Sequence, residues 1–291
     1  MKVTVGVPLL NVSATVLDAV RSVFAQTFED WELLLVDDGS SDGTPDLVRG
    51  VHDSRVRVLT DGLHRGLVPR LNQIILAARG SFIARMDADD LMHPERLAKQ
   101  VAFLEGNPGI DLVSSGIFSI GSRNELHGIR ALEDDEPDLP TIFRQGGIIH
   151  PCVVTRREWS RRHLYDPGFP RAEDRELWVR TYSNSRFAKL PEPLYFYREV
   201  GQFNLRKFLA SYQTERKILK THGPSLLGKS AMGMLLWRLR AKGLAVRLLH
   251  ALGAGNLLMV SRCEPASELQ REDFEDALKK IRQTRLPGID S

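Results

Sequence analysis

The sequence predicts an α/β protein with a mostly parallel sheet flanked by helices, followed by a helical C-terminal appendage. Three observations predict this fold class. Short apolar or β-branched runs alternate with helical patterns in the first hundred residues. Acidic residues, Asp38 and Asp87 among them, directly follow two of these runs, where the carboxyl ends of parallel strands would meet. The last third of the chain is basic and helical in character.

Each element of the N-terminal half follows from its local pattern. The four expected strands are short and mostly apolar, and they cover residues 2–9, 31–36, 55–59 and 81–86. The four expected helices have apolar residues at helical spacing, and they cover residues 13–25, 45–52, 67–79 and 94–104. Ser13 and Thr44 suit helix N-caps, and Pro45 and Pro94 suit a first helical turn. This alternation predicts a parallel sheet that is covered on both faces.

Further elements are expected beyond residue 104. Two more strands are indicated over residues 111–120 and 148–155, a helix over 173–184 and an edge strand over 194–198. The segment 132–139 is rich in acids and prolines, and it is expected to form a mobile loop over the cleft.

Length and composition allow one catalytic domain with an appendage, and we expect the domain over residues 1–200 and a basic helical C-terminal region over residues 201–291. With 291 residues, of which 42% are hydrophobic, the chain can bury a sizeable core. The net charge of +3 is mild, and the N-terminal half has no basic stripe with interleaved aromatic residues. We therefore expect no nucleic-acid partner.

The cysteine content and the longest apolar runs predict the compartment. The two cysteines, Cys152 and Cys263, have no metal-type spacing, which indicates reduced thiols and a cytoplasmic protein. The apolar start at residues 3–10 is interrupted by Pro8 and reads as a core strand, not as a signal peptide. No run approaches the roughly 18 apolar residues of a membrane span, so none is expected.

Three aspartates stand directly after the fourth expected strand: Asp87, Asp89 and Asp90. A strand that delivers carboxylates into solvent at its C-terminal end is a way to hold a divalent metal against a phosphate. Mg²⁺ and Mn²⁺ prefer such oxygen ligands. The alternative is an acidic turn that caps the helix at Pro94.

Four ordered motifs carry a resemblance to a known family. They read Val7-Pro8-Leu9-Leu10-Asn11, Val36-Asp37-Asp38-Gly39-Ser40-Ser41-Asp42-Gly43-Thr44, Asp87-Ala88-Asp89-Asp90 and Glu173-Asp174-Arg175-Glu176-Leu177-Trp178. In this order they resemble glycosyltransferase family 2, and the resemblance covers roughly residues 2–198. It implies a GT-A (Rossmann-like) fold, a nucleotide-sugar donor and inversion at the anomeric carbon. The family usually has Tyr where Leu10 stands, so apolar contact would replace aromatic stacking on the donor base.

The resemblance also assigns roles on the donor side. Asp89 is the expected direct metal ligand, and Asp87 would contact the donor ribose or a metal-bound water. Asp38 would accept hydrogen bonds from the base or ribose, and its alternative is a turn-forming Asx residue. Arg70 is expected to contact the donor, with an exposed helix arginine as the alternative. The loop beneath the base would be shaped by Pro8, Leu10 and Asn11, although Asn11 also suits a plain turn.

A second pair of carboxylates is expected on the acceptor side. A sugar hydroxyl is a poor nucleophile, so a carboxylate must remove its proton as it attacks. By resemblance Asp174 is this base, and Glu173 supports it or orients the acceptor. The alternative is that both acids only favour a helix N-terminus through its dipole. His150 lies near the acceptor side in such a site, and a hydrogen-bonded core histidine is the other interpretation.

The C-terminal region differs in kind from the rest of the chain. Between residues 202 and 262 the only acid is Glu215, whereas lysines and arginines are frequent. On one helix an apolar stripe is formed by Leu235, Leu239, Gly243 and Val246, and a second apolar face on the opposite side by Trp237, Leu244 and Leu248. Such a helix either lies on an anionic membrane surface or packs in a helical bundle.

Two functions remain open at this point. The first is an inverting, metal-dependent glycosyltransferase that uses Mn²⁺ or Mg²⁺ and a nucleotide-sugar, UDP-sugar by default. Its acceptor would be a glycan or a lipid-linked molecule, and the C-terminal helices could place it at the inner face of the membrane. The second is an inactive nucleotide-sugar-binding module or a nucleotidyltransferase. The latter would normally show a glycine-rich basic loop after the first strand, and residues 11–15 show neither feature.

Overall fold

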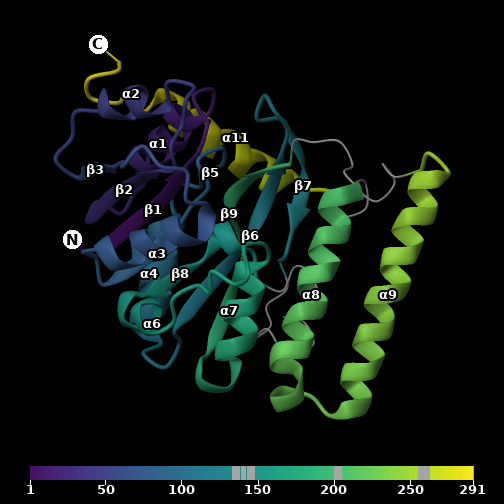
Figure 1. The fold of residues 1–291 in the computed structure, drawn as a ribbon. Helices are drawn as coiled ribbons and strands as arrows, with labels where there is room; N and C mark the ends of the chain where they lie inside the picture. The colour runs from purple at the N-terminus through teal and green to yellow at the C-terminus, as the bar shows by residue number, and fades with distance from the viewer. Residues whose placement is uncertain (133–137, 139–141, 143–147, 200–204, 255–262, 291) are drawn as a thin grey trace.

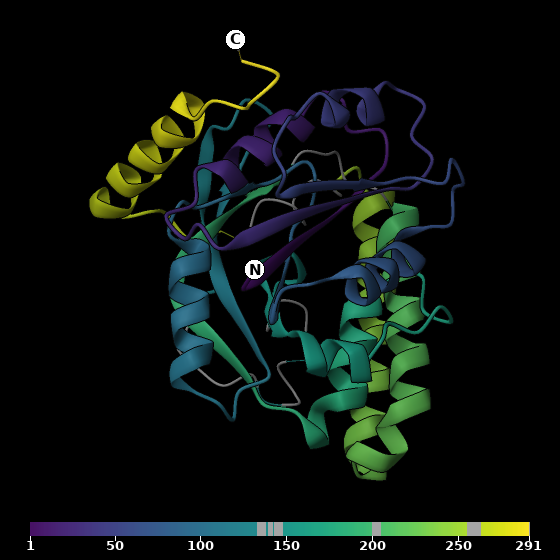
Figure 2. The same ribbon diagram turned by 90° about the vertical axis from the view of Figure 1, so that its left-hand side faces the viewer.

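The computed structural model describes residues 1–132, 138, 142, 148–199, 205–254 and 263–290. Within them a nine-stranded sheet carries helices on its faces (Figure 1; Figure 2 gives the view from the side). The strands are β1 Val3–Leu9, β2 Trp31–Asp37, β3 Val56–Leu59, β4 Phe82–Arg85, β5 Leu91–Met92, β6 Leu112–Ile120, β7 Leu126–Arg130, β8 Val154–Arg156 and β9 Phe187–Arg198. The α-helices are α1 Val16–Phe24, α2 Thr44–Arg49, α3 Leu67–Ala77, α4 Arg96–Gly106, α6 Arg157–Arg162, α7 Glu173–Thr181, α8 Leu205–Leu226, α9 Lys229–Ala251 and α11 Glu268–Gln283.

The first half of the sheet is parallel, in the order β3-β2-β1-β4. The four strands and four helices expected there are confirmed, with boundaries that differ by a few residues. The N-cap expected at Ser13 is wrong, because α1 begins at Val16 and the Ser13 N–H donates to an Asp42 carboxylate oxygen over 2.9 Å. The N-cap expected at Thr44 is also wrong, since α2 begins at Thr44 itself, and Pro94 lies before the first turn of α4. In the β1–β2 pair Leu9 lies beside Asp37, so the two strands end at the same edge of the sheet.

Both faces of this half are covered, as the sequence predicted. Successive side chains of a strand point to opposite faces. Leu33 and Leu35 pack in the layer with α1, α2 and α4, whereas Leu34 and Val36 pack in the layer with α3, α6 and α7. The core around this half of the sheet therefore lies in two apolar layers, one on each side.

The second half of the sheet is mixed, in the order β8-β6-β9-β5, with β7 paired to β6. The edge strand expected over residues 194–198 is wrong: β9 pairs in parallel with β6 and antiparallel with β5, so it lies inside the sheet. The strand expected over residues 148–155 begins only at Val154. A 3₁₀ turn, His150–Cys152, takes its first part, because Pro151 has no N–H to give to a strand ladder.

The C-terminal helices lie on two sides of the sheet (Figures 1 and 2). Helices α8 and α9 form a hairpin whose α8 contacts α7. Helix α11 instead contacts α1, and its Phe274 ring packs on Phe118 and Phe196, with ring centroids 5.4 Å apart in both pairs. The domain boundary at residue 200 stays a prediction. Helix α11 lies beyond this boundary in sequence, but its apolar face packs on the sheet of the first domain.

Two other expectations concern the loop and the membrane. The loop expected over residues 132–139 lies mostly outside the described residues. Among the helices that the structure describes, none combines the length and the hydropathy that crossing a bilayer requires.

Candidate active site

Asp38 stands at the carboxyl edge of the sheet, one residue beyond β2. Its Oδ1 accepts the N–H of Arg65 over 2.7 Å and the Nε–H of Arg70 over 2.9 Å, and its Oδ2 accepts the N–H of Gly66 over 3.0 Å. Burial alone would raise the pKa of Asp38, but these donors outweigh it and hold the pKa below its ordinary value. Asp38 is therefore ionised and fixes the loop before α3.

Arg70 is buried, with 1% of its side chain exposed, so the interpretation as an exposed helix arginine is wrong. Its Nη2 donates to Asp61 over 2.6 Å and to the Leu63 carbonyl over 2.5 Å, and its Nη1 donates to Gln73 over 2.8 Å. The guanidinium is thus engaged within the protein. A contribution of Arg70 to donor binding stays a prediction, and this geometry favours one that acts through Asp38.

Asn11 joins the loops that follow β1 and β2. Its φ of 52° is in the left-handed region, which asparagine tolerates better than most residues. The Asn11 N–H donates to Ser40 Oγ over 3.0 Å, and the Ser41 N–H donates to Asn11 Oδ1 over 2.9 Å. Beside it Leu10 is 42% exposed, while Pro8 is half-buried. These residues lie at the carboxyl edge of the sheet, where the donor base is expected to bind.

The three aspartates after β4 converge on one point. Each offers a carboxylate oxygen, and these oxygens lie within 4.8 Å of one another. Asp90 is buried; its Oδ1 accepts the N–H of Arg198 over 2.7 Å, while its Oδ2 has no hydrogen-bond partner among the described residues. Burial, and then the charge of Asp87, raise the pKa values of Asp89 and Asp90. A divalent cation would satisfy the unpaired oxygen and relieve this repulsion, so the cluster fits a metal bound through oxygen.

Arg85 is a site residue that the sequence analysis missed. It is buried at the end of β4 and holds Asp87 through two contacts of 2.6 and 2.7 Å, while its Nε has no partner within the described residues. Burial lowers the pKa of Arg85, but the Asp87 charge outweighs this and raises it, so the guanidinium stays charged. The available signal was a single charged residue within the apolar run 82–86.

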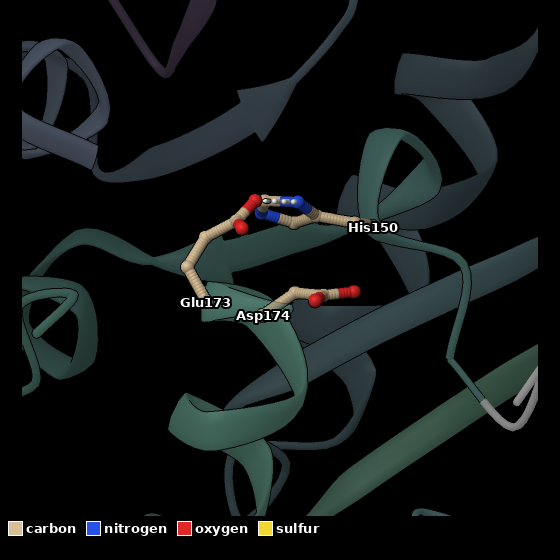
Figure 3. A group of neighbouring side chains, drawn as sticks. All are labelled: His150, Glu173 and Asp174. Atoms are coloured by element: carbon tan, nitrogen blue, oxygen red, sulfur yellow. Dashed lines mark ion pairs between the residues drawn. The ribbon is translucent and has the colours of Figure 1, made fainter. Parts of the chain in front are cut away.

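Glu173 and Asp174 both lie in the first turn of α7 (Figure 3), and a carboxylate oxygen of each lies within 4.8 Å of the other and of a His150 ring nitrogen. The Glu173 carboxylate points toward the imidazole of His150, with Oε1 3.5 Å from Nδ1. Burial raises the pKa of Glu173. The Asp174 carboxylate accepts no hydrogen bond from the part of the chain that the structure describes, so it is open to a ligand.

His150 is buried and hydrogen-bonded, as one of its two interpretations predicted. Its Nε2 lies 2.7 Å from the Tyr165 hydroxyl. Burial, and then the positive charge of Arg85, lower the pKa of His150 to about 3, so the ring is neutral near pH 7. Burial also raises the pKa of Tyr165, which keeps its hydroxyl protonated. The tyrosine can therefore donate to Nε2, and Nδ1–H is then directed at Glu173.

Contacts connect the donor-side carboxylates to the acceptor side. Asp87 pairs with Arg85, which lines one pocket together with Tyr165. The Tyr165 hydroxyl lies 2.7 Å from His150 Nε2, and the other nitrogen of that ring faces Glu173 in the first turn of α7. The charges of Asp87 and Asp174 both act on the pKa of His150, in keeping with this arrangement.

Trp159 and Trp178 are buried beside this site, where the Trp178 ring lies 6.1 Å from that of His150. Each is 2% exposed, and their rings stack with centroids 6.1 Å apart. They are core aromatic residues, and neither presents an exposed ring on which a sugar could stack.

Comparison with known proteins identifies related sequences. The family model described as "Glycosyl transferase family 2" matches residues 4–164. EpsE of Bacillus subtilis, a protein assigned as a glycosyltransferase, is 32% identical over 227 residues, which are 75% of this chain and 80% of EpsE. The Escherichia coli protein WfgD, a UDP-Glc:alpha-D-GlcNAc-diphosphoundecaprenol beta-1,3-glucosyltransferase, is 35% identical over 177 residues, which are 61% of this chain and 68% of WfgD.

Solved structures share the fold. S. aureus TarS in complex with UDP-GlcNAc superposes with a TM-score of 0.64 at 19% identity, covering 98% of this chain and 81% of TarS. The mannosyltransferase PcManGT from Pyrobaculum calidifontis, in complex with GDP-Man and Mn²⁺, gives a TM-score of 0.60 at 17% identity and covers 97% of this chain and 86% of PcManGT. Such distant similarity supports the fold alone, and it confirms the predicted fold class.

Proposed function

This chain belongs to glycosyltransferase family 2 and has the GT-A fold, and from that premise we propose that it is an inverting, metal-dependent enzyme. It would transfer a sugar from a nucleotide-sugar to a hydroxyl of a glycan or lipid-linked acceptor. One observation supports the proposal: contacts through Arg85, Tyr165 and His150 connect the acidic cluster of Asp87, Asp89 and Asp90 to the first turn of α7, which carries the open carboxylate of Asp174. A binding module without catalysis would not require the Asp174 carboxylate.

The donor-side residues suit a departing diphosphate. Asp89 and Asp90 would hold Mn²⁺ or Mg²⁺, which neutralises the charge that develops on the leaving group. Asp87 would remain paired with Arg85 and face the ribose or a metal-bound water. Support for the metal comes from the unpaired Asp90 oxygen and from the Mn²⁺ in the PcManGT complex.

The acceptor-side residues suit activation of a hydroxyl. An Asp174 oxygen would take the proton as the acceptor oxygen bonds to the anomeric carbon and the bond from that carbon to the diphosphate breaks. Attack from the face opposite the leaving group inverts the configuration in a single displacement. Glu173, directed at His150 and more reluctant to ionise, would orient the acceptor.

The relatives suggest the classes of substrate. We propose a UDP-sugar as the donor, in keeping with the UDP-GlcNAc complex of TarS and the UDP-Glc in the name of WfgD. A lipid-linked acceptor is in keeping with the diphosphoundecaprenol in the same name. An enzyme with these substrates would work in the cytoplasm, at the inner face of a membrane.

Donor hydrolysis tests the proposal without a known acceptor. The protein is incubated with a panel of UDP-, GDP- and dTDP-sugars, with Mn²⁺, with Mg²⁺ or with a chelator, and the released nucleotide is measured. We expect slow hydrolysis of UDP-sugars that needs the metal, and release of a sugar with inverted configuration, followed by NMR. Asp89→Asn should raise the metal concentration required by at least about tenfold, because a charged ligand is lost. The matched control is Asp276→Asn on the exposed face of α11, which should behave as the wild type.

Three results would contradict parts of the proposal. Hydrolysis in the presence of the chelator would exclude metal dependence. A retained anomeric configuration would exclude direct displacement. Donor binding with neither hydrolysis nor transfer to any glycan or lipid acceptor would favour the inactive binding module.

A further inference from the structure

The outer face of α9 exposes large apolar side chains in a row. Its members are Met234, Trp237, Leu244 and Leu248, together with Leu252 at the helix C-cap, and we call them the α9 apolar row. Between 60% and 71% of each residue is exposed. They are five of the eleven large hydrophobic residues that are exposed in the described part of the chain, and the other six are scattered. Exposed apolar residues are normal singly, but a contiguous set indicates a binding surface.

The opposite face of the same helix is already occupied. Leu239, Gly243 and Val246 are buried against α8, as the first of the two predicted stripes. A Cβ on Gly243 would lie 3.4 Å from an Arg216 nitrogen and 3.9 Å from the Tyr212 ring, so the two helices approach closely there. Because this packing fixes the rotation of α9, the apolar row on its opposite face points away from α8. Figure 1 shows that α8 lies between α9 and the catalytic domain.

Positive charge flanks the α9 apolar row on both sides. At about 100° per residue, Arg238 and Lys242 fall along one border and Arg240 and Arg247 along the other. All four are exposed, and none forms a salt bridge within the described residues. The sequence of α9 contains no acidic residue at all. The surface therefore combines an apolar centre with two cationic borders.

We propose that this face binds the surface of an anionic lipid bilayer, with α9 lying in the plane of the interface. The apolar row would enter the boundary between headgroups and acyl chains, and the four cations would meet the lipid phosphates. A second copy of the chain fits less well, because its α9 would bring the same four cations against these. The cationic borders thus select a negatively charged partner.

This placement has a consequence for the catalytic domain. Helix α9 packs on α8, and α8 packs on α7, whose first turn carries Asp174. Packed helices have axes about 8–10 Å apart, so α7 would stand roughly 20 Å from a membrane-bound α9. A lipid-linked acceptor would then be presented to the domain from the bilayer. The inference goes beyond the proposed transfer reaction, since lipid binding is measured without donor or acceptor.

The test is a flotation assay of the full chain with vesicles. Vesicles of phosphatidylcholine containing phosphatidylglycerol are compared with vesicles of phosphatidylcholine alone, at low and at high salt. We expect binding to the anionic vesicles, weaker binding at high salt, and a blue shift of Trp237 fluorescence. Trp237→Phe provides the fluorescence background, because the other three tryptophans are buried.

Two variants separate the apolar and the charged contributions. Trp237→Ser with Leu244→Ser and Leu248→Ser should lower the partition coefficient by at least about tenfold, since three apolar side chains that would enter the bilayer are lost. Replacing Arg238, Arg240, Lys242 and Arg247 with Gln should lower it by roughly fivefold per cation on anionic vesicles only. The matched controls are Leu76→Ser with Leu269→Ser, which are exposed leucines elsewhere, and Gln at Arg271, Lys279, Lys280 and Arg282 on α11.

The outcomes decide the inference whether or not the transferase proposal holds. Binding that both α9 variants weaken and both controls retain supports it. Absence of binding to anionic vesicles overturns it, as does binding that the α9 variants leave unchanged. A third result also overturns it: the wild type forms an oligomer and does not bind vesicles, and the triple Ser variant is monomeric. That result would assign the face to self-association. Thermal melting of each variant checks its fold, and the replaced side chains are exposed.

Discussion

Asp174→Asn separates catalysis from binding more sharply than any other single change in this site. The substitution keeps the shape of the side chain and removes its negative charge. The Asp174 carboxylate accepts no hydrogen bond within the described residues, so the variant breaks no existing contact there. We expect its free energy of unfolding to lie within about 1 kcal/mol of the wild-type value.

The expected catalytic loss is large because an amide cannot accept the proton. Removal of a general base typically lowers a rate by about 10²–10⁴-fold. At about 1.36 kcal/mol per tenfold change, this is a loss of roughly 3–5.5 kcal/mol of transition-state stabilisation. Nucleotide affinity should change little, because the metal cluster is built on the loop after β4 and not on α7.

The assay combines turnover and binding in one set of proteins. Metal-dependent donor hydrolysis gives the rate, calorimetry with UDP and Mn²⁺ gives the affinity, and thermal melting gives the stability. Glu173→Gln is the matched control, since the same functional group is lost one residue away and the contact with His150 is retained. It should lose about tenfold at most, as expected for an orienting group.

Two results would refute this reasoning. Turnover of Asp174→Asn within about tenfold of the wild type would exclude it as the base. A much larger loss in Glu173→Gln than in Asp174→Asn would exchange the two roles.

Two further predictions concern the donor base and the response to acid. Leu10→Tyr should tighten UDP binding by up to about tenfold, because Leu10 is 42% exposed and a ring there can stack on the base; calorimetry measures it, and unchanged or weaker affinity would place the base elsewhere. His150 stays neutral in the folded protein down to about pH 3, whereas the unfolded chain protonates near 6.5, so the unfolded state binds more protons between these values. The free energy of unfolding should therefore fall by up to about 1.4 kcal/mol per pH unit as the pH drops below 6.5, and His150→Gln should flatten this slope in denaturant titrations from pH 6 to 4. An equally steep slope in the variant would show that another group causes the acid response.

Local sequence predicted much of the sheet and failed at particular places. Strands β1 to β4 were found because each is a short apolar run between turn residues, which is a property of adjacent residues. The position of β9 was wrong because strand neighbours are chosen by tertiary contacts, and β5, its outer partner, is only two residues long. The strand over residues 148–155 failed because Pro151 outweighs the apolar pattern around it.

The candidate site divides in the same way. Asp89 and Asp174 stand out in sequence because acids directly after an apolar strand or at a helix start form a local pattern. Arg85 and Tyr165 were missed because their importance comes from partners beyond their own segments, such as His150, which reaches Tyr165 from a different element. No local pattern distinguishes a buried arginine that holds a site carboxylate, as Arg85 holds Asp87, from one that packs on the surface.

The order of the N-terminal elements, the acidic residues at the strand ends and the two apolar faces of α9 were determined by the sequence alone. Each depends on the spacing of neighbouring residues, which the periods of strand and helix convert directly into geometry. Tertiary structure decided which face of α9 is covered by α8, that α11 packs on α1, and that contacts through Arg85, Tyr165 and His150 connect Asp87 to the first turn of α7. These are contacts between segments distant along the chain, and their free energy exists only once the sheet has brought them together.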